Sequence, residues 1–187
     1  MKVGEKPLAA YPWYVRLRLL LRLQRRKYGA ILKPGLLWGR SPLVFLAVAG
    51  MYRAIDRKGS PLSPVLRSLV TVRVSQMNSC RFCIDLNSAT LAERAGSLDK
   101  VRALADWRGC GLFDERERVA LEYAEAVSGA GVTVSDELSG RLSKHFNEDA
   151  IVELTALTAF QNLSSRFNSA LDVPEQGFCE LPVHSGE

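Results

Sequence analysis

Apolar residues recur at helical spacing along most of this 187-residue chain, and no segment shows the sustained alternation of a half-buried strand. Helix-boundary signals accompany the pattern: Asp114 with Glu117 forms a capping-box pair, Gly96 follows one predicted helix, and Pro174 lies beyond the last. The predicted helices lie near 12–27, 41–54, 64–76, 80–95, 98–106, 114–128, 135–145 and 148–171. We expect an all-α fold with one domain, because 47% apolar residues can supply a core at this length.

Charge divides the chain unevenly. Residues 1–58 contain thirteen Lys or Arg against two acidic residues, so this part carries +11 although the net charge of the whole chain is only +5. We expect a basic amphipathic arm at 1–29, a helical domain at 30–174 and a C-terminal tail at 175–187.

The helix predicted for the arm has a basic face and an apolar face. Arg18, Arg22, Arg25 and Arg26 share one side, and the apolar residues lie largely opposite. The apolar residues are Trp13, Leu17, Leu20, Leu21 and Leu23. Such a helix can pack on the domain or on a partner subunit, lie on an anionic membrane surface, or contact nucleic acid. Packing is the favoured interpretation, peripheral membrane contact is second, and nucleic acid is the least favoured.

The longest uncharged apolar run, residues 42–52, has eleven residues, whereas a membrane-spanning helix needs about 20. Four cysteines without a secretory signal are typical of a reducing compartment. We therefore expect a cytoplasmic location, in which a cysteine pair would cycle between its oxidised and reduced forms.

Cys80 and Cys83 lie three residues apart at the predicted start of a helix. On an α-helix, positions i and i+3 share a face with Cα atoms roughly 5 Å apart, within the range that a disulfide requires. Asn78 or Ser79 is predicted to cap this helix, which would place Cys80 in the first turn. There, free N–H groups and the helix dipole favour a thiolate. The spacing predicts a redox-active pair.

Two other uses of the pair are open. Structural zinc normally needs four ligands, but Cys110 and Cys179 are isolated, and the two histidines, His145 and His184, are far from each other and from the pair. Free cysteines also pack as small, inert hydrophobic residues in protein cores. The redox interpretation is favoured over both.

Three further runs accompany the pair: LRSLVTVRV at 66–74, ERERVALEYA at 115–124 and NLSSRFNSAL at 162–171. With the cysteines, they resemble the carboxymuconolactone decarboxylase and AhpD-like alkylhydroperoxidase family over about residues 30–174. The resemblance implies an AhpD-like helical bundle that forms homo-oligomers and acts as a peroxidase. It also implies roles for individual residues.

In that family a Glu lies twelve residues before a C-x-x-C-x-x-x-H motif, and the Glu and His relay a proton. The second cysteine attacks the peroxide, and the first resolves the sulfenic acid as a disulfide. By position, the resemblance implies that Cys83 is peroxidatic and Cys80 resolving. Ser68 and Asn87 occupy the Glu and His positions, and neither can act as a base at neutral pH. Without these two residues, the helix N-terminus and Arg81 must stabilise the thiolate. The helix dipole indicates Cys80 as the thiolate, whereas the family mechanism indicates Cys83.

Other ionisable residues are candidates to replace the relay. Asp85 lies about 160° around the helix from Cys83 and is interpreted as a solvated or locally hydrogen-bonded carboxylate. His145, near a helix end, is interpreted as a surface or capping residue, and His184 lies in the tail. Three glutamates could supply the missing carboxylate in three dimensions: Glu93, Glu122 and Glu153.

Trp38, Trp107 and Phe82 are predicted to be core residues, although Phe82 could instead line an apolar entrance. The sequence favours a homo-oligomeric antioxidant protein, a thiol-dependent peroxidase or disulfide oxidoreductase. It would act on a small hydroperoxide or disulfide with a thiol reductant, and without a metal or cofactor. Two alternatives stay open. One is a cofactor-free decarboxylase or lactone enzyme, disfavoured because such branches of the family typically lack the cysteine pair. The other is a non-catalytic or redox-sensing binding protein, which the altered relay supports.

Overall fold

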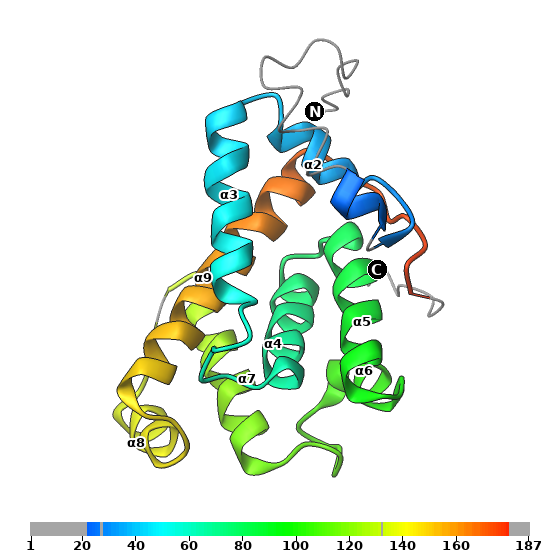
Figure 1. The fold of residues 1–187 in the computed structure, drawn as a ribbon. Coiled ribbons are helices and arrows are strands. Elements are labelled where there is room, and N and C mark those ends of the chain that lie inside the picture. Colours follow the sequence, from blue (N-terminus) through cyan, green and yellow to red (C-terminus); the bar gives the residue numbers. More distant parts are fainter. Residues whose placement is uncertain (1–21, 27, 132, 180–187) are drawn as a thin grey trace.

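The computed structural model describes residues 22–26, 28–131 and 133–179. In this part of the chain the regular elements are all helical, and the long helices pack beside one another in a bundle (Figure 1). None of the described helices combines the length and apolar character of a membrane-spanning segment. The helices are α2 (Lys33–Trp38), α3 (Pro42–Ile55), α4 (Pro64–Met77), α5 (Arg81–Ala95), α6 (Asp99–Ala103), the 3₁₀ turn η2 (Leu104–Asp106), α7 (Glu115–Ser128), α8 (Asp136–His145) and α9 (Glu148–Ala170).

Capping residues confirm the predicted starts of α7 and α9 and the predicted end of α5. Asp114 and Glu117 form a reciprocal capping box at the start of α7, and the Asn147 side chain accepts the N–H of Ala150 at the start of α9. Gly96 ends α5 with φ 72°, a left-handed conformation that glycine adopts without steric cost.

Two predicted elements differ from the structure. The segment expected as one helix at 98–106 is divided into α6 and η2. The six-residue helix α2 was not predicted, because so short an element shows no periodicity. Of the helix expected at 12–27, residues 22–26 are helical. Most of the basic arm lies outside the described residues.

Helix α4 is the centre of the bundle and packs against α5, α7 and α9. Val70 and Val74 belong to a cluster with residues of α7 and α9, while Leu69 and Val72 belong to a second cluster with Leu91 of α5. All five side chains are fully buried. Because α4 is held from several sides, the polar residues on its remaining face have fixed positions.

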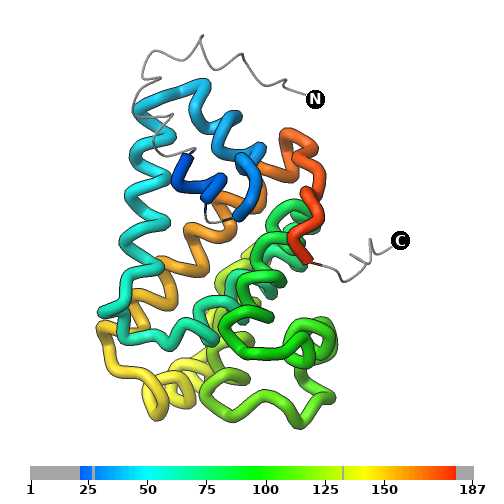
Figure 2. Tube along the Cα trace, turned by 45° about the vertical axis from the view of Figure 1, so that its right-hand side comes forward, coloured from blue at the N-terminus to red at the C-terminus, as the bar shows by residue number. Residues whose placement is uncertain are grey.

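The C-terminal residues 171–179 cross the start of α5 (Figure 2). Asp85 of α5 is 1% exposed and accepts the backbone N–H groups of Gln176 and Cys179 at 2.8 and 2.7 Å. The prediction that Asp85 is solvated or bonded to near neighbours is therefore wrong. Its partners are about ninety residues away in sequence, a distance over which helical periodicity carries no information.

Candidate functional site

The turn between α4 and α5 positions the two cysteines. Asn78 ends α4, Ser79 has a positive φ of 49°, and Cys80 is itself the N-cap of α5, where its Sγ accepts the N–H of Cys83 at 3.3 Å. The prediction that Asn78 or Ser79 caps α5 is wrong. The Asn78 side chain instead bonds Val74 of α4 and Asn162 of α9, because the closing helix lies beside this turn.

Cys80 and Cys83 form a disulfide with a Cα–Cα distance of 5.2 Å, the pairing that their spacing predicted. Both are almost completely buried, at 1% and 4% exposure. Cys83 is among the residues that line a cavity of about 640 Å³, whereas Cys80 is not among its described lining residues. A ligand in this cavity would therefore meet Cys83 first.

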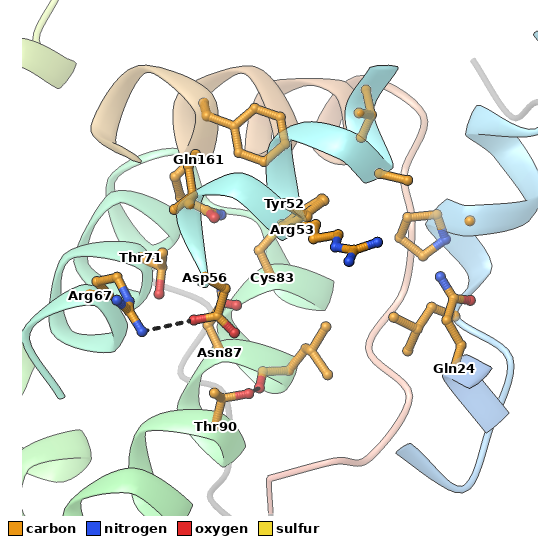
Figure 3. A pocket seen from close by; sticks show the side chains of 18 of the residues that line it. Gln24, Tyr52, Arg53, Asp56, Arg67, Thr71, Cys83, Asn87, Thr90 and Gln161 are labelled. Atoms are coloured by element: carbon orange, nitrogen blue, oxygen red, sulfur yellow. Dashed lines mark hydrogen bonds and ion pairs between the residues drawn. The ribbon is translucent and has the colours of Figure 1, made fainter. Parts of the chain in front are cut away.

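The cavity lies between the polar faces of α4 and α5, one face of α3 and the inner face of α9 (Figure 3). Its volume is within the range of pockets for small organic ligands, about 300–1,000 Å³. On α5 the lining residues Cys83, Asn87, Thr90 and Arg94 follow helical spacing, so one face of this helix extends along the cavity. Residues of 23–38 close the cavity near Cys83.

A buried amide is directed at the sulfur of Cys83. Nδ2 of Asn168 donates to Sγ at 3.2 Å, and Asn168 is 1% exposed. Its Oδ1 is buried without a hydrogen-bond partner. An N–H donor on a cysteine sulfur favours the thiolate over the thiol. Each sulfur thus has its own donor, the backbone of α5 for Cys80 and α9 for Cys83.

Both altered relay positions line the cavity that Cys83 faces. Nδ2 of Asn87 donates to Oγ of Ser75 at 3.1 Å, and Gln161 of α9 donates to the same oxygen at 3.0 Å. Ser68 lies further along α4, where its Oγ accepts from Nη1 of Arg94 at 3.0 Å. Ser68 and Asn87 are therefore hydrogen-bonded to other polar side chains, and neither of these bonds is to a carboxylate.

A cationic cluster occupies the Ser68 end of the cavity. Arg94 bonds both carboxylate oxygens of Asp56 at 2.7 and 2.8 Å, and Nη2 of Arg67 lies 3.4 Å from the same carboxylate. Arg67 is 5% exposed, and Nη1 donates to the backbone oxygens of Leu62 and Arg57. Its Nε has no partner. Burial lowers the pKa of Arg67 from its ordinary value, and Asp56 opposes the shift.

The other ionisable candidates do not reach the sulfur. Glu122 pairs with Arg141 and Glu153 with Arg57, and neither of these glutamates lines the cavity; nor does the exposed Glu93. His145 ends α8 and also lies outside the described lining residues, while His184 lies outside the described part of the chain. Arg81 is exposed and pairs with Asp172 and Glu175, so two carboxylates offset its charge. The described residues contain no group of three or more His, Cys, Asp or Glu placed to hold a metal ion.

The three predicted core aromatics differ in role. Trp107 is 3% exposed and donates its indole N–H to Glu125, which is a structural contact. Phe82 is buried and also lines the cavity, so both interpretations of this residue hold. Trp38 stacks on Phe167 at a centroid distance of 3.5 Å and forms part of the cavity wall.

Sequence reasoning missed the contribution of α9. Five polar residues of this helix are buried, and four of them, at 158, 161, 165 and 168, follow i, i+3, i+7, i+10 spacing. A polar stripe inside a helix that is otherwise in the core was the available signal, because buried polar groups require partners. It points to Gln161 and Asn168. No comparable signal in the sequence distinguished Arg67 and Arg94 from the arginines that lie on the surface.

Comparison with known proteins agrees with this geometry. Residues 42–126 match the model of the carboxymuconolactone decarboxylase family, a segment that contains α3 to α5 and both cysteines. The uncharacterized protein YnjA of Escherichia coli (strain K12) is 50% identical over 180 residues, which cover 96% of this chain and 98% of YnjA. The chain belongs to the carboxymuconolactone decarboxylase family.

Solved structures support the same fold. The alkylhydroperoxidase AhpD core of an uncharacterized peroxidase-related protein from Ralstonia eutropha JMP134 superposes with a TM-score of 0.85 at 23% identity, over 95% of this chain and 93% of that one. The debrominase Bmp8 superposes with a TM-score of 0.81 at 22% identity, over 93% of this chain and 91% of that one. This family member therefore has the AhpD-like helical fold.

Proposed function

We propose that this family member is a thiol-dependent peroxidase in which Cys83 is the peroxidatic and Cys80 the resolving cysteine. The observation that carries the proposal is the Cys80–Cys83 disulfide beside a cavity that only the second cysteine lines among the described residues. A donor from Asn168 to Cys83 supports the thiolate that must attack.

The reaction proceeds in three steps. The Cys83 thiolate attacks the distal oxygen of a hydroperoxide, the O–O bond breaks, and Cys83 becomes a sulfenic acid while the alkoxide leaves and takes a proton from water. The Cys80 thiol then attacks the sulfenic sulfur, which releases water and forms the disulfide. A dithiol reductant finally donates two electrons and two protons and becomes a disulfide itself.

The reductant has to approach from the cavity side. Cys80 is 1% exposed and faces the core, whereas Cys83 lines the cavity. An attacking thiolate would therefore bond to Cys83 and displace Cys80 as the leaving thiolate. We infer that a small dithiol or a narrow protein segment reduces this protein.

Hydroperoxide consumption with an excess of dithiothreitol tests the function. Cys83→Ser should abolish turnover, and Cys80→Ser should consume about one equivalent and stop at a sulfenic acid that a dimedone adduct reveals. Cys110→Ser, which changes a half-buried free cysteine outside the cavity, is the matched control and should retain the wild-type rate. Equal rates in wild type and Cys83→Ser would contradict the proposal. Turnover of disulfides alone would move the function to disulfide exchange at the same pair, and inertness toward both would favour the non-catalytic alternative.

We also propose that the protein assembles into homo-oligomers. Large apolar side chains are exposed on α3 and α9, namely Leu43, Val44, Met51, Val152 and Leu163. Burial of apolar surface stabilises an assembly by about 25 cal/mol per Å². Light scattering at micromolar concentration should give a multiple of 20.7 kDa, and a mass of one chain would contradict this proposal.

A further inference from the structure

Two arginines, Arg67 and Arg94, meet at the end of the cavity remote from the sulfur of Cys83. Cys83 and Arg94 lie at opposite ends of the cavity-lining face of α5, eleven residues apart, and the helical rise separates their Cα atoms by about 16 Å. Thr90 and Asn87 lie between them. A molecule that touches both ends must therefore be elongated.

The wall near Cys83 is apolar. Phe82 and Leu86 line the cavity and belong to the same hydrophobic cluster as Cys83. Trp38, another lining residue, stacks on Phe167 of that cluster. Such a wall favours the hydrocarbon part of a ligand, because the transfer of apolar surface out of water is favourable.

The lining of the cavity as a whole carries an excess of positive charge. Five of the described lining residues are cationic and one is a carboxylate. The cations are Arg53, Arg57, Lys58, Arg67 and Arg94, and the carboxylate is Asp56. Glu153, outside the cavity, pairs with Arg57 and so neutralises one of the five. The remaining excess favours an anionic group on the ligand.

Asp56 demonstrates which anion fits. Both oxygens of its carboxylate accept from Nη2 of Arg94, and a carboxylate therefore fits beside the two guanidinium groups at this end of the cavity. The buried Arg67 lies next to it with an unpartnered Nε and one long contact from Nη2, so the Nε–Nη2 edge of its guanidinium is left under-satisfied. An unsatisfied buried donor is costly, and a second carboxylate at this end would relieve that cost.

We propose that the cavity selects amphipathic hydroperoxides that carry a carboxylate remote from the peroxide group, as in the hydroperoxides of long-chain fatty acids. The acyl chain lies against the apolar wall with the O–O bond at Cys83, and the carboxylate contacts Arg94 and Arg67. The inference rests on the proposed peroxidase function and adds the substrate class. The bond changes at Cys83 are those given above, because the carboxylate takes no part in them.

Kinetics with linoleic acid hydroperoxide and its methyl ester test the class. Wild type should show a KM about tenfold lower for the acid, with similar kcat, because the carboxylate binds equally in the ground and transition states. Arg94→Gln should remove this preference and leave the ester unchanged. Asp56→Asn should lower the KM for the acid, since it frees both arginines from their counterion, whereas Arg94→Gln should raise it. Arg102→Gln, an exposed residue of α6 outside the cavity, is the matched control and should behave as wild type.

Binding to the oxidised protein separates this inference from the proposed function. Calorimetry should detect dodecanoate at least tenfold more tightly than dodecanol, and Arg94→Gln should abolish the difference. If this preference appears but no hydroperoxide turns over, the carboxylate site stands and the peroxidase proposal fails. If acid and ester turn over equally, and neither Arg94→Gln nor Asp56→Asn changes the ratio, the peroxidase proposal stands and the substrate class is overturned.

Discussion

Two clusters of arginine and carboxylate groups in this bundle have opposite character. In one, Glu125 of α7 accepts from Arg73 of α4, from the Trp107 indole and from Arg108, and it lines no part of the cavity. In the other, Asp56 is shared by Arg67 and Arg94 beside an open volume, and an arginine Nε is left without a partner. The first cluster, which we call the closed cluster, joins helices. The second, which we call the open cluster, retains a free hydrogen-bond donor for a ligand.

The difference shows how structural and ligand-binding charge clusters can be separated. Burial alone raises the pKa of a carboxyl group, yet the donors from Arg108, Trp107 and Arg73 bring the pKa of Glu125 below its ordinary value. None of the atoms of this cluster is among the described buried polar atoms that lack a hydrogen-bond partner. In the cluster of Asp56 and Arg67, by contrast, Nε of Arg67 has no hydrogen-bond partner. A ligand in the adjacent cavity can supply that partner.

The largest expected effect is on the closed cluster. Glu125→Gln should lower the free energy of unfolding by about 2–3 kcal/mol, because the buried contacts to Arg73 and Trp107 lose their charged acceptor. Urea denaturation followed by circular dichroism measures this loss. Glu122→Gln on the same helix is the control, since its pair with Arg141 is more exposed and should contribute less than about 1 kcal/mol. Equal losses in the two variants would contradict the comparison.

The stability from Glu125 should depend on pH. Its pKa is lowered in the folded protein, so its contribution is complete above the unfolded value of 4.5 and is lost as the pH falls through the folded value. The difference in unfolding free energy between wild type and Glu125→Gln should therefore be constant at neutral pH and shrink below about pH 4.5. A difference that stays constant down to the acid transition would show that Glu125 is not the titrating group.

A smaller effect is expected when the relay is restored on the cavity side. Ser68→Glu with Asn87→His should raise the peroxidase rate about tenfold, toward the lower end of what general acid–base groups contribute. Ser68→Glu alone should do little, because Arg94 already bonds the Ser68 side chain and would pair with the new carboxylate. Stopped-flow rates with cumene hydroperoxide, which carries no carboxylate, avoid interference from the cationic end. No gain in the double variant would mean that proton transfer does not limit the rate.

The smallest effect should follow loss of the carboxylate in the open cluster. Asp56→Asn should change the free energy of unfolding by less than about 1 kcal/mol, because the Asp56 side chain is 41% exposed, its contact to the buried Arg67 is long at 3.4 Å, and the Asn oxygen still accepts from Arg94. The same urea experiment compares it with Glu125→Gln. If Asp56→Asn is as destabilising as Glu125→Gln, the open cluster is a structural ion pair and not a ligand site.

The sequence by itself determined most of the long helices, several of their caps and the pairing of Cys80 with Cys83. Periodicity, the Asp114–Glu117 box and Gly96 act over one or two turns, and the Cys80–Cys83 disulfide needs only i, i+3 geometry. Resemblance to the family then identified the relay positions Ser68 and Asn87, and both do line the cavity.

Only the tertiary structure decided which groups surround the sulfur. Asn168 reaches Cys83 from 85 residues away, and Arg67 and Arg94 meet at Asp56 because α3, α4 and α5 converge there. Asp85 is held by the returning C-terminal segment, although its neighbours in sequence suggested a solvated carboxylate. Local patterns record how each helix buries its own face, whereas the partners of a polar side chain depend on helix packing, which no short stretch of sequence encodes.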